Sequence, residues 1–398
     1  MLLRCLSNRG PGTKDREPAT TDWNEVVALA VYHGLAPLLF KRLKESDARA
    51  CVATDAWERL RQAYFAGASM NSRLYRELGP VLRCLCSSAI PVVALKGAYL
   101  AEAVYGDVAL RPMCDVDLMV PRAELPRAQA ILLDLGGVYH QSENHESFDW
   151  TGHHHMRPVV VRDLTLEIHW TIVPPTWPVR IDAAGLWDRA RPVTIAGVEV
   201  LALSPEDLLL HLCLSFIDSG LTGLKLLCDI AETIHRFGGE IDWAQVAHLA
   251  REWRAARHVG LTLHLARSTV GAAVPADALE QLVPGGLDQR TLETARECVI
   301  AQTDCLRSGT LIDNWDAMSL GGKAKLSCER VFLSHEEMAV MYPASRKAKH
   351  LWPYYVLRLR DATRTLVAHV LRRGLPTARS GMQDRNAALA NWLRSRRP

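Results

Sequence analysis

The 398-residue sequence has no long apolar run. Its apolar stretches are short and interrupted by charged residues, so the sequence predicts no transmembrane helix. The N-terminal stretch MLLRCLSNRGPGTKDREPATTDW is too polar for a signal peptide, which needs a continuous apolar segment. The ten cysteines contain no CxxC pair, which argues against a zinc site built from them and favours reduced thiols. We therefore expect a cytoplasmic protein.

A strong excess of one charge is also absent. The formal net charge is +3, with 23% charged and 48% hydrophobic residues, which is ordinary for a globular protein. The overall balance therefore demands neither a nucleic acid nor a membrane as partner. The length allows more than one hydrophobic core, so two or three domains are expected.

The spacing of apolar residues predicts an α+β fold built from consecutive segments. Helical spacing precedes residue 90, short apolar strands follow up to residue 203, and helical spacing returns after Ser204, which is placed to cap a helix. The expected segments are a disordered N-terminus over 1–20, an N-terminal helical segment over 21–89, an α/β core over 90–203, a helical domain over 204–344 and a basic helical tail over 345–398.

The stretch LRPMCDVDLMV, residues 110–120, places two aspartates inside an apolar run. Side chains alternate across a strand, so Val116 and Leu118 face a core while Asp115 and Asp117 share the other side. Carboxylates roughly 5–7 Å apart repel each other, which makes one of them hard to ionise unless a divalent cation is bound. Oxygen ligands of this kind favour Mg²⁺ or Mn²⁺.

A third strand, DLTLEIHW over residues 163–170, repeats this arrangement. Leu166 and its apolar neighbours form one face, while Glu167 and His169 lie on the other. Three acids on neighbouring strands would make a two-metal centre for phosphoryl or nucleotidyl transfer. The alternative for a lone D-x-D pair is a solvated strand face.

The segment LKGAYL, residues 95–100, reads as a glycine turn followed by a helix. Glycine lets backbone N–H groups approach a phosphate, and a helix offers its positive N-terminal end to an anion. The turn precedes the two aspartates and a third acid follows them, so the functional interpretation of the D-x-D pair is favoured.

Together these motifs resemble the polymerase-beta-type nucleotidyltransferase superfamily, whose signature is a glycine turn, a D-x-D strand and a third acid on a later strand. The order LKG, LRP, DVDLMV, LEIHW and SPEDLLLHLCL, within roughly residues 22–273, is similar to a narrower bacterial family of uncharacterised nucleotidyltransferases. Members of that family often lie near genes for natural-product and modified-peptide biosynthesis. The resemblance implies a small mixed β-sheet core flanked by N-terminal helices and a C-terminal helical domain.

The resemblance also implies roles for individual residues. Asp115 and Asp117 would hold two Mg²⁺ or Mn²⁺ ions, and Glu167 would complete the second site and activate the acceptor hydroxyl. Gly97 and Ala98 would line the phosphates. The implied reaction is in-line attack on the α-phosphate of a nucleoside triphosphate such as ATP. A nucleoside monophosphate would pass to a small-molecule or peptide acceptor, and pyrophosphate would leave.

The glycine turn departs from the superfamily pattern. It is Gly97-Ala98 rather than Gly-Ser or Gly-Gly, so a serine hydroxyl often used on a phosphate is absent. Gly97 also stands 18 positions before Asp115, which is longer than the common spacing. Lys96 could supply the missing phosphate contact as a point charge.

Three further charged residues are candidates for the nucleotide site. Arg111, just before the D-x-D strand, could neutralise phosphate charge, or it could pair with Asp107 or brace the turn. Lys225 and Asp229 lie four residues apart and share a helix face. They could form a wall of the nucleotide cleft, and the alternative is a weak surface pair.

Four histidines are weaker candidates. His169 shares a strand face with Glu167, so it could stand behind the metal ligands or contact substrate, and a hydrogen-bonded histidine at the edge of the core is the alternative. His153, His154 and His155 look like a metal cluster. Consecutive residues converge on one ion with difficulty, however, so we expect this run to be exposed in a polar loop.

The C-terminal stretch from residue 345 to 398 is strongly basic. It holds 13 Lys/Arg and two acids, so it could contact RNA, an acidic peptide or a membrane surface. A solvated helix docked on the body is the default interpretation. The basic tail leaves open an alternative function as a toxin-like modifier of RNA or protein. A second alternative is a catalytically idle binding scaffold that kept the fold.

Overall fold

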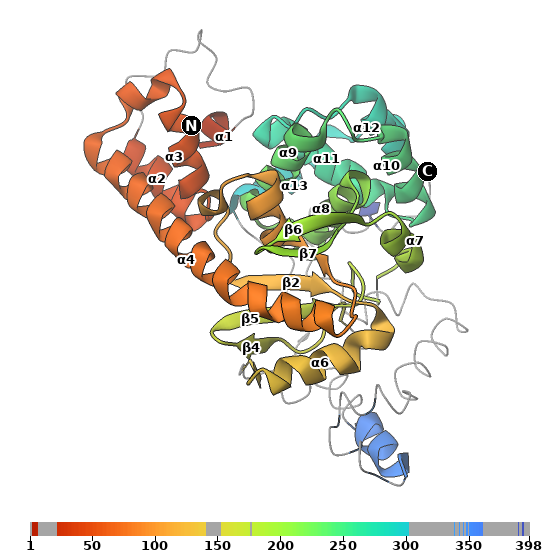
Figure 1. Ribbon diagram of the computed structural model, residues 1–398. Helices are drawn as coiled ribbons and strands as arrows, with labels where there is room; N and C mark the ends of the chain where they lie inside the picture. The colour runs from red at the N-terminus through yellow and green to blue at the C-terminus, as the bar shows by residue number, and fades with distance from the viewer. Residues whose placement is uncertain are drawn as a thin grey trace.

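The computed structural model describes residues 2–6, 22–140, 153–175, 177–301 and 350–360, together with seven isolated positions between 338 and 393. It shows an α+β fold, as predicted: a mixed sheet with helices before and after it in the chain (Figure 1). Most of the predicted basic tail lies outside the described residues. Among the described helices, none combines the length and the apolar character that a membrane crossing requires.

The N-terminal helices are α2 (Trp23–Tyr32), α3 (Ala36–Lys44) and α4 (Thr54–Ser87). Asp22 caps α2 by accepting hydrogen bonds from the backbone N–H groups of Asn24 and Glu25. Helix α4 runs diagonally across the molecule in Figure 1 and contacts strands of the sheet and α6 (Leu125–Asp134). It therefore ties the N-terminal helices to the sheet.

The first residues differ from the sequence-based expectation. Residues 2–6 form the short helix α1 (Leu2–Leu6), although disorder was expected over residues 1–20. Leu2, Cys5 and Leu6 lie three and four residues apart and are buried, so they share one apolar face that packs against α3. A five-residue helix is held by that burial rather than by its own propensity. Residues 7–21 lie outside the described residues.

Seven strands form the sheet in the order β3-β4-β5-β2-β1-β7-β6. Strand β2 runs parallel to β5 and antiparallel to β1, and β1 runs parallel to β7, so the sheet is mixed as the family resemblance implied. The strands are β1 (Val93–Ala94), β2 (Asp115–Met119), β3 (Val138–Tyr139), β4 (Val159–Val161), β5 (Leu164–His169), β6 (Arg191–Ile195) and β7 (Val198–Ala202).

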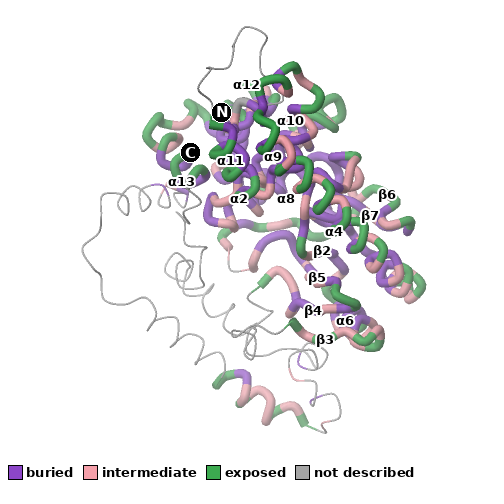
Figure 2. The backbone as a smooth tube through the Cα atoms, turned by 90° about the vertical axis from the view of Figure 1, so that its left-hand side faces the viewer, coloured by how far each residue is buried: buried purple, intermediate pink, exposed green. Residues whose placement is uncertain are grey.

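The predicted apolar faces of β2 and β5 are buried. Val116 and Leu118 on β2 and Leu166 on β5 have no exposed surface, and they face away from the acids of the same strands. Strands β6 and β7 form a hairpin that turns at Ala196-Gly197, where both residues have a positive φ, as a two-residue hairpin loop requires. Figure 2 shows that buried residues line the interior of the molecule.

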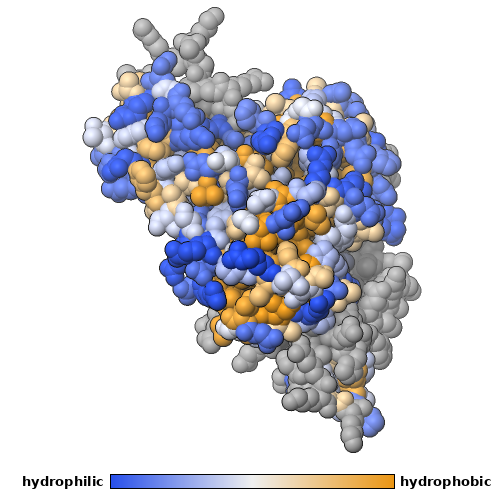
Figure 3. Space-filling model, viewed as in Figure 1, coloured by the Kyte–Doolittle hydropathy of each residue, from blue (hydrophilic) through white to orange (hydrophobic). Residues whose placement is uncertain are grey.

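The chain after the sheet is helical over the described residues. Ser204 caps α8 (Pro205–Asp218) through the backbone N–H of Asp207, as predicted. The following helices are α9 (Leu224–Phe237), α10 (Trp243–Glu252), α11 (Ala256–Val270), α12 (Ala276–Leu282) and α13 (Gln289–Ala301). On the face shown in Figure 3, hydrophilic residues dominate the outer helices and apolar residues gather toward the middle.

Shorter elements complete the fold: η1 (Asp47–Cys51), α5 (Lys96–Tyr99), the π-helical η2 (Leu100–Val104), η3 (Val108–Leu110), η4 (Arg122–Glu124) and α7 (Ala183–Asp188). Among the described cysteines, Cys213 and Cys228 are buried free thiols, as expected. Cys298 is disulfide-bonded, which the expectation of reduced thiols did not include.

Replacing Leu118 with alanine should destabilise the fold strongly. Its side chain is completely buried on the apolar face of β2, and a cavity at such a position costs about 2–5 kcal/mol. Urea denaturation of the wild type and of Leu118→Ala measures the loss. The matched control is Leu29→Ala, because Leu29 is 41% exposed. Equal losses in the two variants would contradict the predicted burial of β2.

Candidate active site

Two adjacent parallel strands bring the predicted carboxylates together. Residues of β2 and β5 pair in register, so Asp117 lies beside Glu167, and Asp115 lies beside Thr165. Because the side chains alternate across each strand, the three acids project from the same face of the sheet. The apolar residues between them are anchored in the core, so the positions of the acids are fixed by the packing of their own strands.

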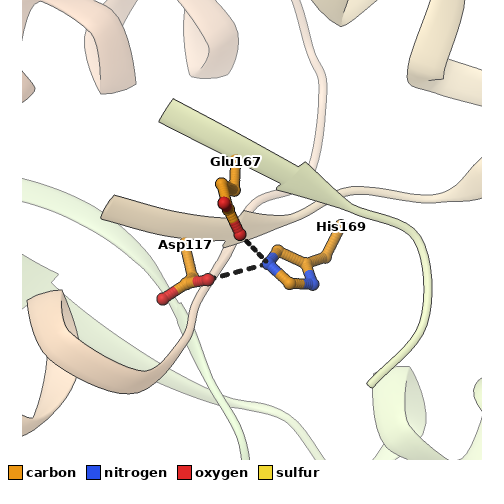
Figure 4. Close-up of side chains that lie close together, drawn as sticks. All are labelled: Asp117, Glu167 and His169. Carbon is orange, nitrogen blue, oxygen red and sulfur yellow. Dashed lines mark hydrogen bonds and ion pairs between the residues drawn. The ribbon is translucent and has the colours of Figure 1, made fainter. Parts of the chain in front are cut away.

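Asp117 is the most enclosed of the three acids, with 5% of its surface exposed. Its Oδ1 accepts a hydrogen bond from the Lys96 ammonium at 3.0 Å and lies 2.8 Å from Nε2 of His169. The same Nε2 is 3.6 Å from Oε2 of Glu167. Figure 4 shows both carboxylates pointing at the His169 ring from the two neighbouring strands.

A metal ion could be held by side chains of this cluster. One ligand atom each from Asp117, Glu167 and His169 lies within 4.8 Å of the others. Asp115 does not belong to that tight group, although the charges of the other two acids act on it. Carboxylate oxygens suit Mg²⁺ or Mn²⁺, so the donor set fits the ion type that the sequence predicts.

The predicted electrostatic conflict between the two aspartates is present. Burial raises the pKa of Asp115, and the negative charges of Asp117 and Glu167 raise it further. Burial alone would also raise the pKa of Asp117, but Lys96 and His169 hold it well below its usual range. The two pKa values are pushed apart because one carboxylate has two cationic or hydrogen-bonding partners and the other has like charges beside it.

The residues of the turn before β2, Lys96 to Ala98, lie in different environments. Lys96 has a φ of 37°, in the left-handed region that non-glycine residues seldom adopt, and its ammonium reaches Asp117. Gly97 and Ala98 are both buried. A Cβ on Gly97 would lie 2.7 Å from a guanidinium nitrogen of Arg111 and 3.1 Å from the sulfur of Met113. Gly97 is therefore needed for the close approach of Arg111, and phosphate contacts for this turn remain a prediction.

Arg111 forms a buried ion pair with the helical domain. Its Nε and Nη2 both lie 3.0 Å from oxygens of Asp229 on α9, and the Tyr105 hydroxyl donates to the same carboxylate at 2.9 Å. Asp107, the partner considered from sequence, accepts a hydrogen bond from the Tyr64 hydroxyl instead. The charge of Arg111 is thus already neutralised by a buried carboxylate.

Lys225, one turn before Asp229 on α9, has a different environment. Its ammonium donates to the carbonyl of Pro112 at 3.3 Å, and no ion pair of Lys225 is found among the described residues. Burial and the nearby positive charge of Arg111 lower its pKa. Of the three predicted cationic residues, Lys225 is therefore the one whose charge is not offset by a direct carboxylate contact within the described part of the chain.

The histidine run lies against the site rather than in open solvent. The rings of His154 and His155 lie 5.0 Å and 5.3 Å from the ring of His169, and both residues are half-buried, while His153 is exposed as expected. Backbone pairing of His155 with His169 produces this contact. Sequence spacing could not show it, because the pairing joins residues separated by a strand and a turn.

Two more groups behind the cluster were not expected from the sequence, and both lie on α8. His211 is fully buried, and burial lowers its pKa to about 3. Asp218 ends α8, and burial raises its pKa to about 6 although Lys96 and His169 act in the opposite direction. The only sequence signal for them was a polar residue at a buried helical position, and this signal is common in ordinary cores.

Breaking the Arg111–Asp229 pair should be costly. Both side chains are buried, at 7% and 0% exposed, so Asp229→Ala leaves an uncompensated charge in the core, a loss of about 3–5 kcal/mol. Chemical denaturation measures it. Glu240→Ala is the control, because Glu240 pairs with Arg191 at an exposed position. The stability of the Glu240→Ala variant should be close to that of the wild type. The double variant Arg111→Met/Asp229→Leu should recover most of the loss, and no recovery would contradict the unpaired charge as its cause.

The raised pKa of Asp218 predicts a pH-dependent stability. Because the folded-state pKa of about 6 exceeds the ordinary aspartate value of about 3.9, the folded state binds the proton more tightly, and stability falls as the pH rises between these values. Asp218→Asn removes the charge, so it should stabilise the protein by roughly 2 kcal/mol above pH 7, allowing for partial exposure, and by nothing near pH 4. Thermal or urea unfolding at both pH values tests this, and a pH-independent difference would contradict it.

Two solved structures are similar to part of this chain. No curated protein matches the chain. A solution structure of the antibiotic-resistance factor ANT(2'')-Ia is similar to 49% of this chain over 98% of its own, at 15% identity and a TM-score of 0.33. A crystal structure of ANT(2'')-Ia with adenylyl-2''-tobramycin matches 45% of this chain and 96% of its own, at 16% identity and a TM-score of 0.32.

A family model gives the firmer result. The model described as "Uncharacterised nucleotidyltransferase" matches residues 19–271. That span includes the turn, both strands with their three acids, and Lys225 and Asp229 on α9. Because the match covers more than half of the chain, the chain belongs to this family of uncharacterised nucleotidyltransferases.

Proposed function

We propose that this protein transfers a nucleoside monophosphate from a nucleoside triphosphate to a hydroxyl group of a small-molecule or peptide acceptor and releases pyrophosphate. The observation that supports this most directly is the in-register pairing of β2 with β5, which gathers Asp115, Asp117 and Glu167 on one face. Nucleotidyl transfer needs such a group of carboxylates beside a bound triphosphate.

The proposed cofactor is Mg²⁺ or Mn²⁺, and the superfamily resemblance implies two ions. Asp115, Asp117 and Glu167 are the residues proposed to hold the metal. When bound, a divalent cation would neutralise the triphosphate and polarise the phosphorus that is attacked.

The remaining chemistry would fall to side chains of the protein. The acceptor oxygen forms a bond to the α-phosphorus, while the bond from that phosphorus to the bridging oxygen breaks and its electron pair leaves with pyrophosphate. Glu167, half-buried at the edge of the cluster, is proposed to accept the proton of the acceptor hydroxyl. Its pKa is lowered because the contacts with His169 and His155 outweigh burial, so it is ionised and available as a base at neutral pH.

Lys225 is the proposed contact to the triphosphate from the helical domain. Its charge lacks a carboxylate partner in the described part of the chain, and Asp115 is among the groups that act on it electrostatically. Arg111 and Asp229 form a buried ion pair with each other. We therefore propose that they shape the wall of the nucleotide cleft rather than contact the triphosphate. Lys96, Gly97 and Ala98 complete the proposed nucleotide site, with His169 positioning the carboxylates.

The proposal predicts binding of a triphosphate before any acceptor is known. A thermal-shift panel of ATP, CTP, GTP and UTP with Mg²⁺ should raise the melting temperature with at least one nucleotide, because a ligand that binds only the folded state stabilises it. The increase should depend on the metal and disappear with EDTA. No shift with any of the four nucleotides would count against the proposed function.

Isosteric neutral variants test the carboxylates. Asp117→Asn and Glu167→Gln should each lower the rate of transfer from a labelled triphosphate by about 100-fold or more, because metal and base contributions of several kcal/mol are lost and each 1.4 kcal/mol is tenfold. Asp134→Asn is the matched control, since Asp134 is exposed at the end of α6. Unchanged transfer in the first two variants would refute the assignment.

A second candidate rests on the basic tail. With 13 Lys/Arg against two acids over residues 345–398, an RNA acceptor would be bound chiefly through phosphate contacts. Removing that stretch should then weaken RNA binding and flatten its salt dependence. Binding that is unaffected by salt would exclude this candidate.

A further inference from the structure

The ammonium of Lys96 occupies a position among the carboxylates of the proposed active site. It lies 3.0 Å from Oδ1 of Asp117, and the charges of Glu167 and Asp115 also act on it. Its side chain is 21% exposed and that of Asp117 is 7% exposed, so this ion pair is largely removed from solvent. A cation at such a position does for the carboxylates what a metal ion would do, because it offsets their mutual repulsion.

The backbone holds Lys96 in a strained conformation. Its φ of 37° lies in the left-handed region, which is strained for a residue other than glycine. The next residue is a buried glycine over which Arg111 passes, and the carbonyl of Asp117 accepts the backbone N–H of Leu95 at 3.0 Å. The turn is thus fixed from both sides, and its strained residue is the one that reaches Asp117.

His169 occupies the same oxygen of Asp117. Its Nε2 lies 2.8 Å from Oδ1, while its buried Nδ1 has no hydrogen-bond partner among the described residues. A histidine that binds a metal through one nitrogen normally donates a hydrogen bond from the other. Without an acceptor for Nδ1, the proton belongs on Nε2, so His169 is a hydrogen-bond donor to the carboxylates rather than a metal ligand.

Both donors therefore meet at Oδ1, and no hydrogen bond to Oδ2 of Asp117 is found among the described residues. Oδ1 is thus occupied by two partners, and Oδ2 is the oxygen of Asp117 that is open to a metal ion. The formal charges agree: three carboxylates and one ammonium leave two negative charges, which a single divalent ion neutralises.

We propose that Lys96 takes the place of one of the two metal ions implied by the superfamily resemblance, so that this site works with a single divalent cation. The inference rests on the proposed function. In the transfer step, the acceptor proton passes to Glu167 while the new oxygen–phosphorus bond forms and pyrophosphate leaves with its electron pair. Lys96 keeps its proton throughout and stabilises the negative charge at Asp117 electrostatically.

Manganese EPR tests this proposal without measuring turnover. The protein is saturated with Mn²⁺ in the presence of the α,β-methylene analogues of ATP, CTP, GTP and UTP, which cannot release pyrophosphate. Two Mn²⁺ ions about 3.5–4 Å apart would be magnetically coupled. The wild type should instead give the uncoupled six-line spectrum of an isolated ion, with one Mn²⁺ bound per chain.

The variant Lys96→Met keeps the length of the side chain and removes its charge. It should bind a second Mn²⁺, so the stoichiometry rises from one to two and a coupled spectrum appears. Lys225→Met is the matched control, because it removes an equal charge from the other side of the site. It should weaken binding of the analogues and leave the stoichiometry at one.

The outcomes separate the two proposals. A coupled pair in the wild type, or a stoichiometry that stays at one in folded Lys96→Met, would overturn the role of Lys96 and leave the proposed function standing. No binding of Mn²⁺ or of any analogue by the wild type would overturn both. Circular dichroism checks that Lys96→Met is folded, and if it is not, the wild-type spectrum decides alone.

Discussion

Three carboxylates on neighbouring parallel strands repel one another, and the positive and hydrogen-bonding groups that offset this repulsion organise the structure around them. Lys96 and His169 both reach Oδ1 of Asp117, and they come from different elements, the strained turn after β1 and the end of β5. The stabilisation that holds the acids in place comes from apolar burial and not from these partners. The apolar faces of β2 and β5 are completely buried, so packing forces the acids together and local partners make the arrangement tolerable.

A second ion pair links the sheet to the helices that follow it. Arg111, in the loop before β2, donates hydrogen bonds to the carboxylate of Asp229 on α9. The same carboxylate accepts a hydrogen bond from the Tyr105 hydroxyl. Because both charges are buried, the pair is costly to separate, and it fixes α9 across the entrance to β2. Lys225 is on the same helix and is thereby placed over the loop that precedes the acids. The helical domain can therefore shape the site although none of its residues lies on the sheet.

Much of this arrangement could be predicted from local sequence patterns. The alternation in DVDLMV and LEIH, the capping residues Asp22 and Ser204 and the turn at Ala196-Gly197 all depend on neighbours within a few residues, and the structure agrees with them. The ordered helix at Leu2–Leu6 and the packing of His154 and His155 on His169 could not be predicted. Both depend on partners far along the chain, which a pattern of nearby residues does not contain.

The sequence by itself determined which residues share a strand face, because side-chain alternation is a property of the extended backbone alone. It thereby determined that Asp115 and Asp117 lie on one side and Glu167 and His169 on one side of a later strand. Only the tertiary structure decided that these two faces are the same face, through the parallel register of β2 and β5. It also decided the partners of the cationic residues: Lys96 reaches Asp117, Arg111 is neutralised by Asp229, and Lys225 donates to the carbonyl of Pro112. Each of those pairings joins residues distant in sequence, and only the packed core determines which of them meet.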